Sequence, residues 1–255
     1  ALARDDRPWG GTAPPGVVFT YAFGRGGQHA ERILQGFGGI LQVDGYAGYN
    51  RLIAADRIGP GIHLAYCWAH ARRKFFDLHQ ANASTVAFEA LQRIGKLYAV
   101  EAESKHLSTE ARQQLRAEKS LPILQSLHDW LLQTRFHTAD GGGTAKAVDY
   151  TLKRWQSLIR YARSGHLPID NNPVENTIRP IALGKKNWLF TGSERAGKRA
   201  AAIQTLLGTA KLNGLNPAQW LAGTLEKLPT WSNSRIDELL PFAPEAIEAL
   251  LKECG

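Results

Sequence analysis

A change in hydrophobic period near residue 80 limits the folds open to this chain of 255 residues. Before it, runs of β-branched and aromatic residues alternate with short helical patterns, and strands are expected at residues 17–23, 39–45 and 62–68. After it, residues 84–163 carry apolar side chains three and four positions apart, which is typical of helices that bury one face. The pattern therefore predicts an α/β part with a wholly helical segment inserted into it or packed on it.

One predicted strand ends on an acid. Asp44 directly follows Ile40, Leu41 and Val43, which are spaced as in a largely buried strand. A carboxylate at the end of a buried strand is held rigidly, as a metal ligand must be. An Asp-Gly pair after a strand is also a strong signal for a hairpin turn. On these residues alone both interpretations stay open.

A second acid, Glu175, lies at the predicted start of a helix. Pro173 suits a first helical position, and Glu175 follows three residues after Asn172, so this segment fits a capping box. Glu175 and Arg179 are also spaced as an i,i+4 pair. The same carboxylate precedes a basic and aromatic segment, which suits metal-assisted chemistry on a phosphate backbone. Spacing does not decide between the two roles.

Positive charge is concentrated around Glu175. The net charge is +8, and residues 166–212 hold seven cations against three anions, whereas residues 213–255 hold three against six. A polyanionic partner is expected, and nucleic acid is the commonest one, although a solvated basic face is the alternative. The candidate DNA-binding residues are Arg72, Arg73, Lys74, Arg179, Lys185, Lys186, Arg195, Lys198 and Arg199.

Several other classes of protein lack support in the sequence. The chain contains no run of eighteen apolar residues, its start does not resemble a signal peptide, and two cysteines cannot form a disulfide framework. A soluble protein of the reducing cytosol is therefore expected. His63, Cys67 and His70 have spacings that suit zinc, but no fourth ligand is evident, and a buried free cysteine is the simpler interpretation.

Five segments together resemble the insertion-sequence 66 family of transposases. GILQVDGYAGYN (39–50), CWAHARRKF (67–75) and IDNNPVENTIRPIALGKKNWLFTG (169–192) are similar to the signature blocks of that family. TAKLNGLNPAQWL (209–221) and RIDELLPF (235–242) resemble its C-terminal element. The resemblance runs along essentially the whole chain and in the family's order, so it is far more specific than any single motif.

The resemblance implies an α/β fold with a ribonuclease-H-like core, in which a mixed sheet flanked by helices is interrupted before the helix that bears Glu175. Residues 1–80 would form the first part of this core and residues 81–165 a large all-helical insertion. Residues 166–212 would complete the core with the Glu-bearing helix and the basic segment. Residues 213–255 would form a helical C-terminal element.

The resemblance also implies an activity and its site. Asp44 matches the family's second acid and Glu175 its third, so both would be catalytic and would bind two Mg²⁺ ions, for which Mn²⁺ can substitute. The reaction would be DNA cleavage and strand transfer by phosphoryl transfer. The expected partners are transposon ends, target DNA, further copies of the chain and accessory proteins of the same element, in the bacterial cytoplasm at the nucleoid, with no membrane.

One departure from the family concerns its first acid. That acid lies on the first core strand, in a block upstream of the region that matches residues 4–9, and Asp5 and Asp6 align with a turn after a strand. The core is therefore expected to lack its first strand. A truncated, catalytically inactive DNA-binding remnant is the alternative function. A metal-dependent nuclease without strand transfer is a third hypothesis.

Overall fold

The computed structural model describes residues 1–184 and 191–242. The chain divides into two compact units. Gly24–Asn171 form one, which we call the central unit, and Ala1–Phe23 with Asn172–Gly255 form the other, the terminal unit. Lys185, Lys186 and the end of the predicted C-terminal element, from residue 243 on, lie outside the described residues.

A pair of parallel strands begins the central unit. β3 (Gly39–Val43) pairs with β4 (Ile62–Tyr66), and Val43 stands opposite Tyr66 at the carboxyl ends of both strands. The connection contains a 3₁₀ helix (Ala47–Ile53), which packs against α1 (Gly27–Ile33). Both strands occur where the sequence predicts them. Their inner faces join a small apolar cluster of Leu34, Leu41, Val43, Leu52, Ile62 and Leu64.

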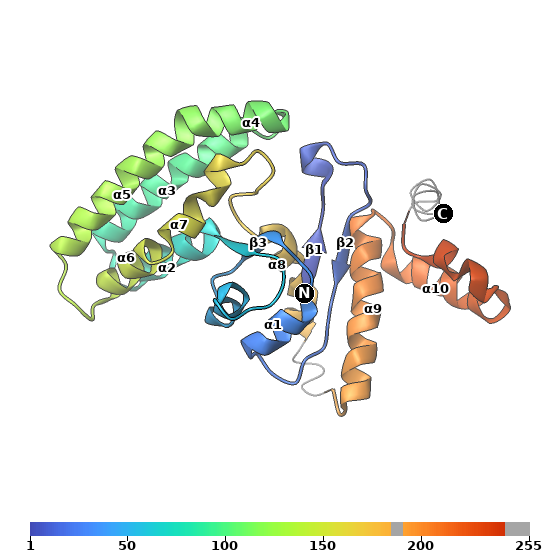
Figure 1. The fold of residues 1–255 in the computed structure, drawn as a ribbon. Coiled ribbons are helices and arrows are strands. Elements are labelled where there is room, and N and C mark those ends of the chain that lie inside the picture. The colour runs from blue at the N-terminus through green and yellow to red at the C-terminus, as the bar shows by residue number, and fades with distance from the viewer. Residues whose placement is uncertain (185–190, 243–255) are drawn as a thin grey trace. The chain divides into compact units, whose positions relative to one another are not determined.

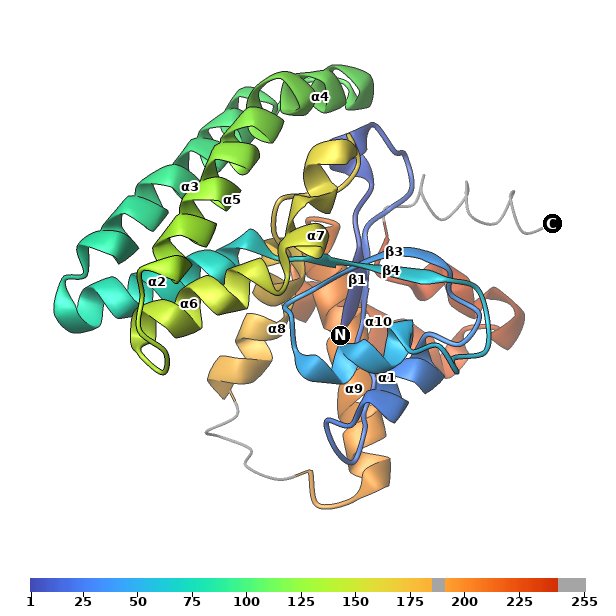
Figure 2. The same ribbon diagram turned by 60° about the vertical axis from the view of Figure 1, so that its left-hand side comes forward.

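Helices make up the rest of the central unit, which confirms the prediction for residues 84–163. In order they are α2 (Trp68–Asn82), α3 (Thr85–Glu103), α4 (Thr109–Leu115), a π-helical turn (Arg116–Ser120), α5 (Leu121–Phe136), α6 (Gly143–Leu152), α7 (Trp155–Leu158) and a 3₁₀ helix (Ile159–Arg163). α3 and α5 lie side by side and pack against α2 and α6 respectively (Figures 1 and 2). The predicted stripes form the core, with Ile94, Leu97, Leu127, Leu131 and Val148 fully enclosed.

Trp68, at the start of α2, connects the β3–β4 pair with the helices through packing and hydrogen bonds. Its ring is fully buried, meets Trp155 edge-on with 5.9 Å between ring centroids, and donates from Nε1 to the carbonyl of Leu158 at 2.9 Å. Its backbone N–H donates to the carbonyl of Ile169 at 3.1 Å. Residues 167–171 are thereby held beside the carboxyl end of β4.

A buried arginine fixes the last part of the helical segment. Arg116 is enclosed and pairs with Glu101 at 2.5 Å. The same guanidinium donates to the carbonyls of Tyr161, Ser164 and Leu167. Each nitrogen of this buried guanidinium has an acceptor. The segments that supply the acceptors are held in place, because leaving any one of these donors unpaired would cost free energy.

A two-stranded antiparallel sheet begins the terminal unit. β1 (Leu2–Arg4) pairs with β2 (Gly16–Val18). The predicted strand at residues 17–23 is therefore wrong beyond Val18. α9 (Glu194–Leu212) runs along β2 (Figure 1), and its Thr209 and Thr205 hydroxyls accept from the N–H groups of Val17 and Phe19 at 3.3 and 2.9 Å. Side chains of a helix thus take the place of a further strand.

The other helices of the terminal unit are α8 (Asn172–Gly184) and α10 (Pro217–Lys227). The α9–α10 connection follows its sequence signals: Gly214 adopts a φ of +75°, and the Asn216 side chain accepts from the N–H groups of Ala218 and Gln219. Short 3₁₀ helices at Leu228–Thr230 and Asn233–Leu239 follow.

The described structure is thus mostly helical with two small sheets, as a mixed α/β class predicts. Within the described ranges, none of the helices combines the length and the apolar character that a bilayer-crossing segment needs.

Candidate active site

Asp44 lies directly after β3, at the carboxyl end of the parallel pair, and is half-buried. Its Oδ1 accepts the N–H of Tyr46 at 2.9 Å, and Gly45 between them adopts a φ of +86°. Asp44 and Gly45 therefore form a turn. This turn does not lead into a hairpin, because the next strand in the unit is parallel to β3. Of the two interpretations left open by the sequence, the hairpin is excluded and the strand-end carboxylate remains.

Two side chains from the helical segment cover this turn. The Tyr150 hydroxyl lies 3.4 Å from the carbonyl oxygen of Asp44, and Arg154 Nη2 lies 3.5 Å from that of Gly45. Burial raises the pKa of Tyr150, with Arg154 opposing the shift and Asp44 adding to it, so the hydroxyl stays protonated and can donate. The sequence does not mark either residue as a candidate for the site. It shows only that the two are four positions apart, as on one face of a helix.

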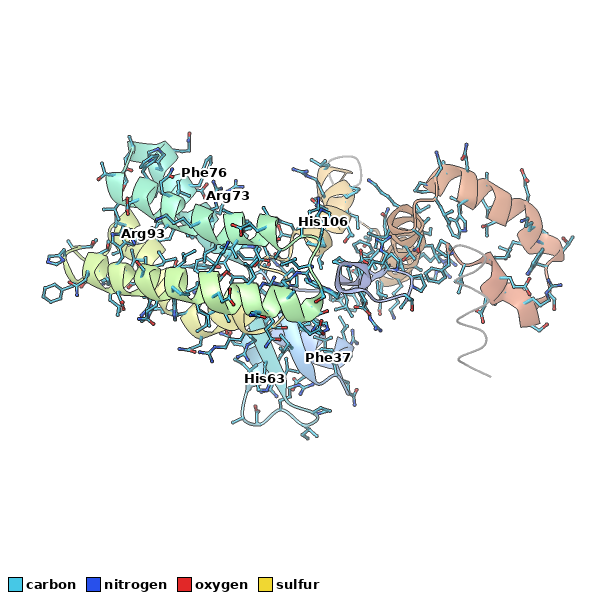
Figure 3. The ribbon with its side chains drawn as sticks, turned by 90° about the horizontal axis from the view of Figure 1, so that it is seen from above. Phe37, His63, Arg73, Phe76, Arg93 and His106 are labelled. Carbon is cyan, nitrogen blue, oxygen red and sulfur yellow. The ribbon has the colours of Figure 1, made fainter. Side chains whose placement is uncertain are left out.

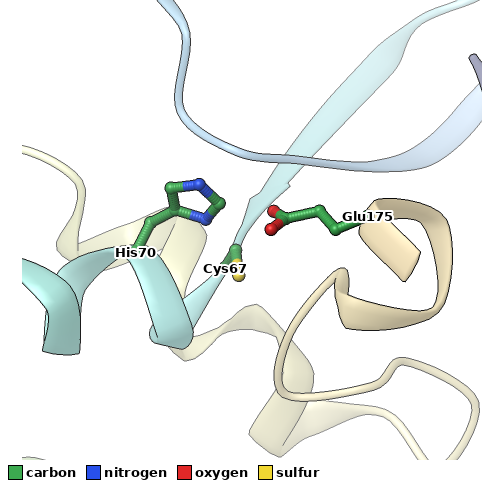
Figure 4. A group of neighbouring side chains, drawn as sticks. All are labelled: Cys67, His70 and Glu175. Carbon is green, nitrogen blue, oxygen red and sulfur yellow. The ribbon is translucent and has the colours of Figure 1, made fainter. Parts of the chain in front are cut away.

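The carboxyl end of β4 carries further polar groups of the central unit. Cys67 is buried, its Sγ accepts the N–H of Asn171 at 3.5 Å, and it lies within 4.8 Å of a ring nitrogen of His70 in the first turn of α2 (Figure 4). Burial raises the pKa of the Cys67 thiol to about 11. Without a metal the thiol is therefore protonated at neutral pH, as is typical of a buried free cysteine. His63 lies exposed on β4 (Figure 3).

Asp170 is a buried carboxylate in the same neighbourhood. Tyr98 of α3 donates to its Oδ2 at 3.1 Å, and burial raises the pKa of the Tyr98 hydroxyl, with the charge of Asp170 as a further cause. Asn171 beside it is also buried. Asp170 and Asn171 belong to the block that contains Glu175, and no separate signal in the sequence marks them as functional residues.

Glu175 lies in the first turn of α8, as predicted, and is half-buried. Asp44 belongs to the central unit and Glu175 to the terminal unit. Each acid therefore has the local setting that the sequence predicts, a strand end and a helix start. A metal site shared by both carboxylates stays a prediction.

The predicted DNA-binding cations are exposed wherever they are described. Arg72, Arg73 and Lys74 follow one another on α2, where Figure 3 labels Arg73. Arg73 pairs with Asp77 at 3.1 Å, and Lys74 Nζ lies 5.3 Å from the centre of the Tyr150 ring. In the terminal unit, the exposed cations are Arg179 on α8 and Arg195, Lys198 and Arg199 on α9, with Lys198 paired to Glu194 at 2.7 Å.

Comparison with known proteins gives two family matches. Residues 1–199 match the model described as "Transposase IS66 family", and residues 205–242 match "IS66 C-terminal element". The first range ends and the second begins on α9, and the first includes Asp44, Glu175 and every candidate cation.

Three curated relatives come from Sinorhizobium fredii (strain NBRC 101917 / NGR234). The chain is 42% identical to "Uncharacterized protein y4qI" over 97% of its own length and 47% of the relative. It is 38% identical to "Uncharacterized protein y4hP" over 93% of the chain and 45% of the relative, and 37% identical to "Uncharacterized protein y4jD" over 95% and 48%. The chain spans about half the length of these relatives. No solved structure matches it. On the strength of the two family matches, the chain belongs to the IS66 family of transposases.

Proposed function

We propose that this chain is the catalytic-core portion of a DNA transposase and takes part in metal-dependent cleavage and strand transfer of an insertion sequence. The observation that carries the proposal is Asp44, a half-buried carboxylate at the carboxyl end of a parallel strand pair, within the range that matches the transposase model. In open α/β sheets, ligands bind outside the carboxyl ends of the strands.

The proposed fold is a ribonuclease-H-like core with a helical insertion. The described strands form two separate two-stranded sheets, β1–β2 antiparallel and β3–β4 parallel, and a single mixed sheet is part of the proposal. The helical segment, residues 84–163, falls between Asp44 and Glu175 in the sequence. We assign residues 1–80 and 166–212 to the core, residues 81–165 to the insertion and residues 213–255 to the C-terminal element.

Asp44 and Glu175 are the proposed catalytic acids and metal ligands. One oxygen of Asp44 accepts the Tyr46 N–H, and its other oxygen has no protein partner in the described part of the chain. Carboxylate oxygens are the hard ligands that Mg²⁺ and Mn²⁺ prefer, whereas the protonated sulfur of Cys67 suits neither ion. A bound pair of such ions supplies Lewis-acid stabilisation for in-line displacement at phosphorus.

The proposed substrate is DNA, as transposon ends and target. The exposed cations of α2, α8 and α9, with Lys185 and Lys186, would contact phosphates, which gives affinity and positioning without reading sequence. Action as a homo-oligomer on paired ends, with accessory proteins of the same element at the bacterial nucleoid, completes the proposal for the whole protein.

A DNA-binding remnant without catalysis is the second candidate. Only two acids of the chain match the family's motif, and the side chains of Asp5 and Asp6 are engaged locally. Asp5 accepts from Arg7 at 2.8 Å, and Asp6 pairs with Arg4 at 2.5 Å. These are the contacts of turn residues, as the alignment with a turn predicts.

Nicking of a labelled transposon-end duplex, with and without Mg²⁺, separates the candidates. Catalysis predicts Mg²⁺-dependent nicks that disappear in Asp44→Asn and Glu175→Gln and persist in Asp129→Asn, a matched change at a carboxylate 63% exposed on α5. Binding without nicks supports the remnant. Nicks without joining to target DNA indicate a nuclease. Absence of both binding and nicking contradicts the proposal.

A further inference from the structure

We propose that Tyr150 and Arg154 are positioning residues for Asp44, so that the helical segment forms one wall of the active site. The inference rests on the proposed role of Asp44 as a metal ligand, and it concerns the central unit alone. Both residues come from the end of the α6 region, more than a hundred positions after Asp44 in the sequence.

The turn after β3 is closely packed under these two side chains. A Cβ atom added at Gly45 would lie 2.8 Å from the Tyr150 hydroxyl oxygen and 3.3 Å from Arg154 Nε. Any side chain at position 45 would therefore push the two residues away, and the positive φ of Gly45 would strain it as well. The absence of a side chain lets Tyr150 reach the carbonyl of Asp44 and Arg154 the carbonyl of Gly45.

Arg154 is held in place by aromatic rings. Its guanidinium carbon lies 4.0 Å from the centre of the Tyr150 ring and 5.8 Å from that of Tyr66, the last residue of β4. Nη1 donates to the carbonyl of Tyr150 at 3.3 Å, and Nη2 points to the carbonyl of Gly45. A planar guanidinium suits this stacked setting, and a lysine ammonium does not.

The arrangement is a poor device for stability. Among the described residues, Arg154 has no carboxylate within ion-pair distance, and its Nε is buried without a hydrogen-bond partner. Burying such a donor costs free energy. What the guanidinium does gain is a contact with the carbonyl of Gly45, directly after Asp44, while the Tyr150 hydroxyl beneath it contacts the carbonyl of Asp44 itself. Partners that orient a metal ligand from behind typically change metal affinity tenfold to a hundredfold when they are lost.

Mn²⁺ binding by the 255-residue chain, measured from the electron paramagnetic resonance signal of the free ion, tests the inference. Asp44→Asn defines the binding that depends on Asp44. We expect Arg154→Gln to weaken that binding about tenfold and Arg154→Lys to restore little of it. Tyr150→Phe, which keeps the ring and loses a long hydrogen bond, should weaken it about twofold. Lys153→Gln, an exposed neighbour, removes the same charge and should change nothing.

The direction of the effect separates positioning from simple charge. Removing a nearby cation strengthens Mn²⁺ binding by electrostatics, so weaker binding in Arg154→Gln supports positioning, and equal or tighter binding overturns it. Amide exchange of Tyr46 in the metal-free protein gives a second readout. Arg154→Gln and Tyr150→Phe should accelerate it, and unchanged exchange in both overturns the inference. A third result separates the inference from the proposed function. If Asp44→Asn leaves Mn²⁺ binding intact while Arg154→Gln and Tyr150→Phe accelerate the exchange of the Tyr46 amide, Asp44 is not a metal ligand and the proposed function fails. The two residues would then still hold the turn after β3 in place.

Discussion

The two acids lie on elements that are packed to very different depths. Asp44 follows a strand of the central unit, where α3 alone buries five apolar side chains and Trp68, Phe75 and Leu131 are enclosed. Glu175 lies on α8, and neither α8 nor α10 has a buried residue. Leu183 on α8 is 72% exposed. The packing of the central unit therefore fixes the position of Asp44, whereas α8 gains little stability from burial.

The largest effect we expect is on DNA binding. Replacing Lys185, Lys186, Lys198 and Arg199 with Ala should reduce the slope of log K against log salt by roughly 3.6, which is on the order of a thousandfold in affinity near 0.1 M salt. The loss should be equal for all sequences, because phosphate contacts carry no sequence information. Salt-dependent binding measured on two unrelated duplexes checks this.

The matched variant replaces Arg72, Arg73 and Lys74 on α2 of the central unit. If this triple change weakens DNA binding and the fourfold change does not, DNA binds mainly along α2. That result would contradict a main DNA contact through the basic residues of the terminal unit.

A core substitution in the central unit should cost the next largest amount. Ile94→Ala on α3 removes a fully buried side chain and should lower the free energy of unfolding by about 3 to 4 kcal/mol. Leu183→Ala on α8 should change it by less than about 0.5 kcal/mol. Urea denaturation followed by circular dichroism gives both values. Equal losses would show that α8 is as firmly packed as α3.

Replacing a glycine with alanine should change the free energy of unfolding in opposite directions in the two units. Gly45→Ala introduces a Cβ at a φ of +86° and against Tyr150, so we expect a loss of about 2 kcal/mol. Gly223→Ala in α10 meets nothing within 4 Å and should stabilise by about 0.5 to 1 kcal/mol. Thermal unfolding of the two variants decides the matter, and a stable Gly45→Ala protein would contradict the close packing of the turn.

A last effect, which depends on pH, is the alkaline loss of stability from Cys67. Burial raises the pKa of its thiol to about 11 in the folded protein, so the folded state keeps a proton that the unfolded state releases. Stability from this group is complete below pH 9 and falls as the pH rises toward 11, by about 1 to 2 kcal/mol. Cys67→Ala should flatten this part of the pH profile. An unchanged profile would show that the thiol ionises as readily in the folded protein.

Local patterns predict the elements that local physics determines. The strand at Gly39–Val43, Asp44 after it, the helix start before Glu175 and the stripes around Ile94 all follow from periodicity and capping. The strand predicted at residues 17–23 ends at Val18, because Thr205 takes the N–H of Phe19 and the ring of Tyr21 packs on Gly197. Tyr150 and Arg154 escape prediction for the same reason, since contacts between distant segments leave no periodic signal.

Iron-mediated backbone cleavage tests the central claim that Asp44 and Glu175 hold one divalent-metal site. Fe²⁺ replaces Mg²⁺, and with ascorbate and peroxide it cuts the chain beside the bound ion. If the two acids share one site, we expect cuts near residue 45 and near residue 175, both competed by Mg²⁺ and both lost in Asp44→Asn and in Glu175→Gln. A cut at one acid that survives removal of the other would contradict a shared site.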